Sequence, residues 1–274
     1  MKIIVCIKQV PDTAEVKINP ETNNLVREGV PSIMNPYDLC ALKEALKIKA
    51  EIGAFVTAVS MGPLQAQSVL EEALVFGADE AVLLTGKEFA GADTLATGYA
   101  LSEFLRTLKP DIVLCGNEAI DGCTGQVGPI IAENLEWPQI TYVSSFEVKD
   151  GVILAEKETW DSYYSMQTSI PAVICVLKKD GILTDKGYEA FDKEKIRVVS
   201  GDSLKLDPSR IGTAGSPTRV KSISVNNSRP QHYVEIDSTL PAEDRIRMII
   251  NGGIIPKRIN LMRGSKKELA QTIF

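Results

Sequence analysis

Residues 111–135 have the sequence DIVLCGNEAIDGCTGQVGPIIAENL. The apolar run at 111–115 predicts a buried strand, and the apolar spacing over 125–135 predicts a helix. The glycine-rich turn between them is typical of an open α/β sheet, in which ligands bind at the carboxyl ends of parallel strands. Successive glycines let backbone amides approach a phosphate, and the start of a helix adds about half a positive charge. The segment therefore predicts a nucleotide site.

The glycines also have a simpler explanation, because a tight strand–helix connection needs them only for their backbone angles. The segment is not a P-loop, since no Gly-Lys-Ser/Thr follows. It also differs from the usual dinucleotide fingerprint, because it comes after the fourth predicted strand rather than the first. Residues 115–130 contain no Lys or Arg. A pyrophosphate here would need backbone amides, the Thr124 hydroxyl or a cation from a partner subunit, which indicates a shared site.

Short apolar runs alternate with helical periodicity through the first two-thirds of the chain, as in a parallel sheet covered by helices. We predict further strands at 2–8, 54–61, 80–84, 139–147, 152–159 and 172–177, and further helices at 36–52, 65–76 and 94–108. Residues 149–151, Lys-Asp-Gly, predict a hairpin turn. Asn35 and Asp93 are expected to cap helices, with Pro36 at the first helical position and Asp38 facing the free amides.

The sequence after residue 200 is rich in Ser, Asp, Pro and Asn as far as residue 240. We expect an extended C-terminal arm with short helices at 243–250 and 266–273. A tail of this length without its own core usually packs on something else. The predicted organisation is a nucleotide-binding domain over 1–199 and an arm over 200–274 that wraps a partner subunit. The predicted fold class is α/β, a parallel-sheet, Rossmann-like (adenine-nucleotide α-hydrolase-like) domain with an added antiparallel hairpin and this arm.

The composition excludes several classes of function. The 274 residues carry 30 Lys and Arg against 36 Asp and Glu, a net charge of -6. This balance argues against binding to nucleic acid or to an anionic membrane, which needs a basic surface. The single histidine, His232, excludes histidine-cluster metal sites and makes imidazole catalysis a poor explanation. We therefore predict no metal site and no catalytic side chain.

The five cysteines, at positions 6, 40, 115, 123 and 175, form no CxxC pair. Most lie among apolar neighbours, so we predict buried free thiols in a reducing cytoplasm. We see no signal peptide, because Lys8 interrupts the first apolar run. No stretch approaches the ~20 apolar residues of a membrane span.

Three other predicted strand ends meet the same edge of the sheet, at residues 9–13, 60–63 and 91–97. Each has a purely structural explanation, since Asp93 can be a helix cap and Met61 a core residue. Thr94 and Thr97 lie three residues apart, so both hydroxyls can point the same way at a helix start. That spacing suits phosphate or ribose contacts.

Taken together, these segments resemble the β subunit of electron transfer flavoproteins. The matching stretches are 8–12, 34–38, 59–63, 73–79, 116–129, 137–141 and 215–218, in the family's order and spacing. In that family the β subunit pairs with an α subunit carrying an electron-transferring FAD. The β domain binds AMP in simple carriers and a second FAD in electron-bifurcating members.

Two stretches resemble the bifurcating group, 92–97 and 121–129. The resemblance implies a set of cofactor-binding residues from four strand ends. They are Cys6, Asn35, Pro36, Tyr37, Asp38, Met61, Asp93, Thr94, Thr97, Gly116, Ala119, Asp121, Gly122, Thr124, Gly125, Gln126 and Val127.

The resemblance implies that NAD(H) exchanges hydride with FAD in the β subunit. One electron then passes to ferredoxin and the other through the α subunit to a flavin dehydrogenase, or both flow in reverse. Residues 178–192 differ from the stretch by which the family usually recognises its partner. The resemblance therefore does not predict an acyl-CoA dehydrogenase as the docking partner. Another flavin dehydrogenase, such as one acting on a 2-hydroxy acid like lactate, is the expected partner instead.

Three alternatives remain open. A simple carrier would hold structural AMP instead of FAD. A universal-stress-type nucleotide-binding module also has a glycine loop after a fourth strand, but usually in a shorter chain. A stand-alone Rossmann dehydrogenase is disfavoured, because residues 9–12 after the first strand contain no glycine.

Overall fold

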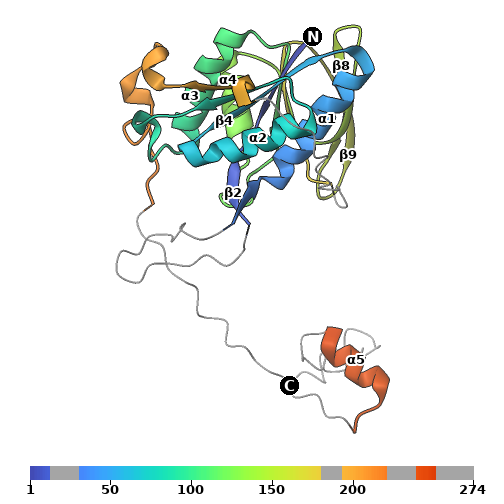
Figure 1. Ribbon diagram of the computed structural model, residues 1–274. Coiled ribbons are helices and arrows are strands. Elements are labelled where there is room, and N and C mark those ends of the chain that lie inside the picture. Colours follow the sequence, from blue (N-terminus) through green and yellow to red (C-terminus); the bar gives the residue numbers. More distant parts are fainter. Residues whose placement is uncertain (13–30, 180–192, 221–238, 251–274) are drawn as a thin grey trace, which may run out of the picture. The chain divides into compact units, whose positions relative to one another are not determined.

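The computed structural model describes residues 1–12, 31–179, 193–220 and 239–250 (Figure 1). The chain divides into two compact units, Met1–Ile223 and Ser224–Phe274. The second unit contains α5 (Ala242–Ile250), which confirms the helix predicted at 243–250. The helix predicted at 266–273 lies outside the described residues. The boundary between the units therefore falls 24 residues after the one drawn from the sequence, at 223 rather than 199.

The first unit is built on a nine-stranded sheet in the order β11-β5-β4-β1-β6-β10-β7-β8-β9. The strands are β1 (Lys2–Cys6), β4 (Phe55–Met61), β5 (Glu80–Leu84), β6 (Ile112–Gly116), β7 (Gln139–Lys149), β8 (Val152–Glu158), β9 (Tyr163–Ser169), β10 (Ala172–Val176) and β11 (Ile196–Val199). All neighbours from β11 to β7 are parallel, and β8 and β9 add an antiparallel extension. A separate antiparallel ribbon joins β2 (Gln9–Pro11) to β3 (Ser32–Met34). The predicted α/β class with a mostly parallel sheet is confirmed.

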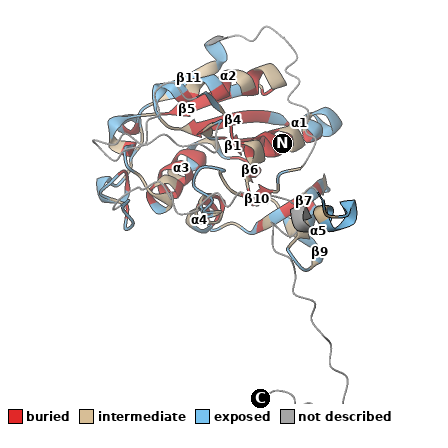
Figure 2. Ribbon diagram, turned by 90° about the horizontal axis from the view of Figure 1, so that it is seen from below, coloured by how far each residue is buried: buried red, intermediate tan, exposed pale blue. Residues whose placement is uncertain are grey.

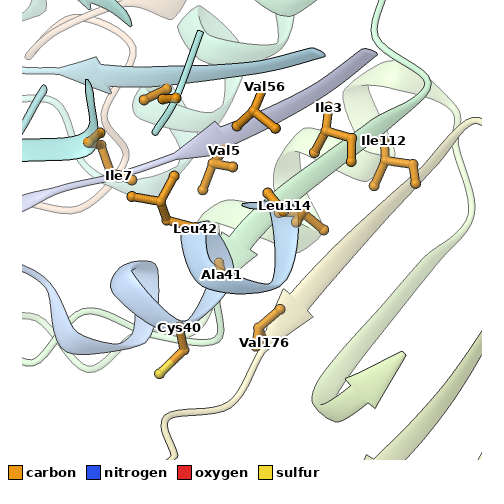
Figure 3. Close-up of a cluster of buried hydrophobic side chains, with 14 of the residues drawn as sticks. Ile3, Val5, Ile7, Cys40, Ala41, Leu42, Val56, Ile112, Leu114 and Val176 are labelled. Carbon is orange, nitrogen blue, oxygen red and sulfur yellow. The ribbon is translucent and has the colours of Figure 1, made fainter. Parts of the chain in front are cut away.

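Four helices cover the two faces of this sheet (Figure 2). The helices are α1 (Pro36–Ile52), α2 (Gln67–Phe76), α3 (Thr94–Leu108) and α4 (Val127–Leu135), with short 3-10 turns at η1 (Leu64–Ala66), η2 (Lys87–Phe89), η3 (Lys193–Lys195), η4 (Gly201–Ser203) and η5 (Pro208–Arg210). Along β1, Ile3 and Val5 pack against α1 and α2, whereas Ile4 and Cys6 pack against α3 and α4. Figure 3 shows the first of these layers, with Leu42 of α1 over Val5 and Leu114. Because both faces are covered, the central strands are mostly apolar, with Thr57 and Ser60 of β4 as buried polar residues.

Most element predictions are confirmed, with small shifts at their ends. The first strand ends at Cys6 rather than residue 8, and α4 begins at Val127 rather than residue 125. The predicted hairpin is confirmed as β7–β8, but a third strand, β9, extends it. Neither β9 nor β11 was predicted. The side chains of β9 are almost all exposed, so its sequence lacks the apolar alternation of a half-buried strand.

The beginning of the predicted arm packs onto the α/β unit. Leu204, Leu206 and Ile211 lie against the core layer of α3 and α4. The Asp207 amide donates to the Tyr99 hydroxyl at 3.1 Å. Residues 200–220 are therefore structurally part of the α/β unit. The predicted wrapping of a partner stays a prediction.

All five cysteines are free, and four of them are buried. Burial raises the pKa of the Cys175 thiol to about 12, so it stays protonated at neutral pH. Cys123, in the glycine-rich segment, is the exposed exception to the predicted burial. No helix in the described ranges has the length and apolarity needed to cross a membrane.

Candidate functional site

The site is built where β1 and β6 lie side by side in the centre of the sheet. After β1 the chain continues into α1 on one face, and after β6 it continues into α4 on the other. This reversal makes a topological switch point, the place where open α/β sheets bind ligands beyond the carboxyl ends of their strands. Cys6, Met61 and Gly116 end three neighbouring parallel strands at this edge.

Asp38 connects the two central strand ends. Its Oδ2 accepts a hydrogen bond from the Lys8 amide at 2.8 Å, and its Oδ1 accepts one from the Gly116 amide at 3.0 Å. The prediction that Asp38 serves the free amides of its own helix is therefore wrong, because its side chain turns back to the sheet. Burial raises the pKa of Asp38 to about 7, against the opposing effect of its hydrogen bonds.

Gly116 is required by this contact. A Cβ at this position would overlap the Asp38 carboxylate and the Tyr37 Cβ. The start of α1 can therefore approach the end of β6 only because residue 116 has no side chain. Gly116 is thus needed for close packing against α1, and not for the backbone angles of a tight turn, which was the simpler explanation of the glycines.

Asn35 holds the segment that follows. Its Nδ2 donates to the Glu118 carbonyl at 2.9 Å, and its Oδ1 accepts from the Ile120 amide at 3.2 Å. In the described part of the chain its side chain makes no capping bond to α1, so that prediction is also wrong. The Tyr37 hydroxyl donates to Glu118 Oε1 at 3.0 Å. Burial and this hydrogen bond raise the pKa of Tyr37.

The outer part of the glycine-rich segment is open to solvent. Asp121, Gly122, Cys123 and Thr124 are exposed, and no described atom lies within 4 Å of the position that a Gly122 Cβ would occupy. Gly125 has φ +62°, in the left-handed region that glycine adopts easily. Asp121 forms an ion pair with the Lys8 ammonium at 2.7 Å. A cation of this chain therefore lies against the segment that itself contains none.

The start of α3 reaches the same segment from the other face of the sheet. The Thr94 hydroxyl donates to Gln126 Oε1 at 2.7 Å. Asp93 caps α3 as predicted, because its Oδ1 accepts from the amides of the second and third helical residues at 3.0 and 3.2 Å. Its Oδ2 accepts from the amide and hydroxyl of Thr218 at 3.0 and 2.7 Å. Burial alone would raise the pKa of Asp93, but these hydrogen bonds bring it below its ordinary value.

The structure thus brings the predicted residues together in two groups. The first, on β1, α1 and the segment after β6, contains Cys6, Asn35, Pro36, Tyr37, Asp38, Gly116, Ala119 and Asp121. The second, around the starts of α3 and α4, contains Asp93, Thr94, Thr97, Gln126 and Val127. Gly122, Thr124 and Gly125 connect the groups along the chain, and Met61 ends β4 at the same edge.

Sequence reasoning did not single out Lys8, Asn117 or Glu118. Asn117 is buried, and its Oδ1 accepts from the Tyr142 amide at 2.9 Å, which ties the segment to β7. Asn117 and Glu118 stood inside the quoted segment, and Lys8 directly follows the first strand, so position alone could have indicated them. The ranges that the structure describes contain no group of three or more His, Cys, Asp or Glu able to hold a metal.

These features define an open, Rossmann-like α/β protein with a glycine-rich segment at the switch point of its sheet. Residues 22–203 match the electron transfer flavoprotein domain. The chain belongs to the electron transfer flavoprotein family.

Named relatives agree with this assignment. The electron transfer flavoprotein subunit beta of Clostridium acetobutylicum is 48% identical over 239 residues, 85% of this chain and 92% of that protein. Protein FixA of Rhizobium meliloti is 41% identical, over 87% of this chain and 86% of that protein. The caffeyl-CoA reductase-Etf complex subunit CarD of Acetobacterium woodii is 42% identical, over 80% of this chain and 86% of that protein. Membership of this family excludes the universal-stress alternative.

Proposed function

We propose that this chain is the β subunit of an electron-bifurcating or electron-confurcating electron transfer flavoprotein, and that it binds FAD at the carboxyl edge of β1 and β6. One observation carries the proposal. In a chain of this family, the 35–38 turn is hydrogen-bonded to the glycine-rich segment at the switch point of the sheet. That arrangement fixes an open, glycine-rich backbone where open α/β sheets bind their ligands.

The residues at this edge fit a nucleotide cofactor chemically. Gly122 leaves its backbone open on the Cβ side, and the first amides of α4 have no acceptor within their helix. At the end of β4, Ser60 buries a hydroxyl whose oxygen has no hydrogen-bond partner among the described residues. Backbone amides, hydroxyls and carboxamides of this kind bind phosphate, ribose and adenine edges. The residues that would hold the cofactor are the two groups defined above, with Met61 and the connecting residues Gly122, Thr124 and Gly125.

A bound FAD would supply hydride acceptance from NADH and one-electron transfer, which no side chain here provides. The chain's own residues bind and orient. The carboxylate of Asp38 and the carboxamide of Asn35 fix the backbone of 116–120, and Thr94 fixes Gln126 at the other end. A single histidine in the sequence is compatible with these roles, because the chain would bind the cofactor and the cofactor would supply the redox chemistry.

The proposed partners are an electron transfer flavoprotein α subunit, ferredoxin and a flavin-dependent dehydrogenase. A 2-hydroxy acid such as lactate is proposed as the substrate of that dehydrogenase. The printed name of CarD places that relative in a reductase–Etf complex, which supports assembly with a dehydrogenase-like partner here. NAD(H) is proposed as the hydride donor or acceptor, and the cytoplasm as the location. The competing candidate is a simple carrier in which AMP occupies the same edge.

Cofactor content distinguishes these candidates. The complex with its α subunit is purified, its cofactors are released by denaturation, and FAD and AMP are quantified. We expect two FAD per heterodimer and no AMP. One FAD and one AMP per heterodimer would contradict the proposal and favour the simple carrier.

Two glycine variants locate the second cofactor. In Gly116→Ala the added Cβ meets Asp38 and Tyr37, so we expect one of the two FAD molecules to be lost. Gly151→Ala is the control for an added methyl group away from the site, because no described atom lies within 4 Å of its Cβ position in the distant β7–β8 turn. Retention of both FAD molecules in Gly116→Ala would place the second cofactor elsewhere.

A further inference from the structure

Lys8 lies against the glycine-rich segment. Its ammonium is 2.7 Å from both carboxylate oxygens of Asp121. The side chains remain partly exposed, at 48% for Lys8 and 32% for Asp121. Residues 115–130 contain no Lys or Arg, so Lys8 supplies from another part of the chain the positive charge that this segment lacks.

The backbone of Lys8 is held on both sides. Its amide donates to Asp38 Oδ2 at 2.8 Å, and its carbonyl accepts from the Asn35 amide at 2.9 Å. Asp38 also accepts from the Gly116 amide, so the Lys8 backbone lies beside the first residue of the segment. The anchored backbone leaves only the four-carbon stem free, and its ammonium lies against Asp121 of the segment.

The Lys8–Asp121 ion pair is easily exchanged. Exposed ion pairs contribute little to stability, because water and salt screen them. A phosphate carries more negative charge than a carboxylate and accepts strong, charge-assisted hydrogen bonds from an ammonium. Asp121 is exposed and followed by Gly122, whose Cβ side is open, so this carboxylate has room to move away.

We propose that Lys8 is the phosphate-binding cation of this site, and that Asp121 holds its ammonium in place until a nucleotide phosphate replaces the carboxylate. The assignment rests on the proposed nucleotide-binding function. It removes the need for a partner subunit to supply the cation. It also makes Asp121 a determinant of specificity, because its carboxylate repels nucleotides in proportion to the charge of their phosphates.

The test compares ADP with adenosine, which differ only in the pyrophosphate. Binding to the full-length chain, freed of bound nucleotide, is measured by titration calorimetry for the natural sequence, Lys8→Met and Asp121→Asn. Lys47→Met is the matched control, because it breaks an exposed ion pair with Glu51 on α1 and changes the net charge equally. Urea unfolding of each variant verifies that it is folded.

We expect Lys8→Met to weaken ADP binding by about 10- to 100-fold, the effect of losing a charge-assisted hydrogen bond, and to leave adenosine binding unchanged. Asp121→Asn should strengthen ADP binding several-fold at low salt, and this gain should shrink as salt rises. Equal changes for ADP and adenosine in Lys8→Met, or no change in either, would overturn the assignment while leaving nucleotide binding intact. Failure of the natural sequence to bind either compound would overturn the proposed function as well.

Discussion

The starts of α1 and α3 look alike in sequence and differ in structure. Each has an Asn or Asp just before the first helical residue, at Asn35 and Asp93. At α3 the Asp93 side chain caps its own helix with one oxygen and binds Thr218 with the other. At α1 both polar side chains, Asn35 and Asp38, instead bind residues at or just after the ends of β1 and β6. Local capping bonds are therefore replaced by long-range ones at the switch point.

This difference indicates that the start of α1, and not only that of α3, helps to build the candidate nucleotide site. A cap satisfied within its own helix stabilises that helix by about 1 kcal/mol and leaves the neighbouring strands independent. A side chain that is buried and bonded across the sheet fixes the relative position of distant backbone segments. Substitutions at Asp38, Asn35 and Asp93 should therefore change the free energy of unfolding by decreasing amounts.

The first prediction concerns the pH dependence that Asp38 contributes. Its folded-state pKa is about 7, whereas an unfolded Asp titrates near ~3.9. The folded carboxyl therefore holds its proton more tightly, and its contribution to stability is fully present below about pH 4 and lost as pH rises through 7. At ~1.4 kcal/mol per pH unit the loss is at most about 4 kcal/mol.

Urea unfolding of the full-length chain and of Asp38→Asn at pH 5 and pH 8 checks this. The free energy of unfolding of the natural sequence should fall relative to that of the variant as pH rises. Parallel pH profiles for the two proteins would contradict the burial of an ionisable carboxyl at residue 38.

The second prediction concerns Asn35, whose side chain is 1% exposed. Asn35→Ala leaves the Glu118 carbonyl and the Ile120 amide without their partner, and we expect a loss of about 2 kcal/mol. Asn35→Asp keeps an acceptor for Ile120 but turns a buried carboxylate oxygen towards the Glu118 carbonyl, so it should destabilise the protein at least as much as Asn35→Ala. Hydrogen exchange at the Ile120 amide should accelerate in Asn35→Ala. Unchanged exchange there would show that the 116–120 segment is held by other contacts.

The third prediction concerns Asp93, the locally capping residue. Asp93→Ala should cost about 1 kcal/mol, the usual effect of removing a helix cap. Asp93→Asn keeps one oxygen for the cap and loses the acceptor for Thr218, so we expect roughly half that loss. Thermal or urea unfolding of the three proteins measures the order. If Asp93→Asn were as damaging as Asp93→Ala, the bond to Thr218 would outweigh the cap.

The sequence predicted the central sheet well because burial on both faces leaves a strong local signal. β1, β4, β5, β6 and β10 are mostly apolar runs, α1 and α2 end at glycines, and α3 begins at the Asp93 cap. β9 carries no such signal, because only its hydrogen bonds to β8 make it a strand. The packing of residues 204–211 on α3 was also missed, since it depends on contacts across more than 100 positions.

The candidate site was predictable as a location but not as a set of contacts. The glycine-rich segment after a buried strand indicated the right edge of the sheet, and the Asn35–Asp38 turn matched by resemblance. The roles of Asn35 and Asp38 were misassigned, because a capping pattern describes only neighbours along the chain. Lys8 was overlooked for the same reason, since its partner Asp121 lies 113 residues away.

The sequence by itself determined the α/β class, the order of its main elements and the family, because these follow from periodicity, caps and motifs that are local in the chain. The tertiary structure alone decided which polar groups meet. It turned Asn35 and Asp38 from helix caps into connections between β1 and β6, and it placed Lys8 against Asp121. The physical reason is that sheet pairing brings strand ends from 100 residues apart within hydrogen-bonding distance, and burial then selects the partners.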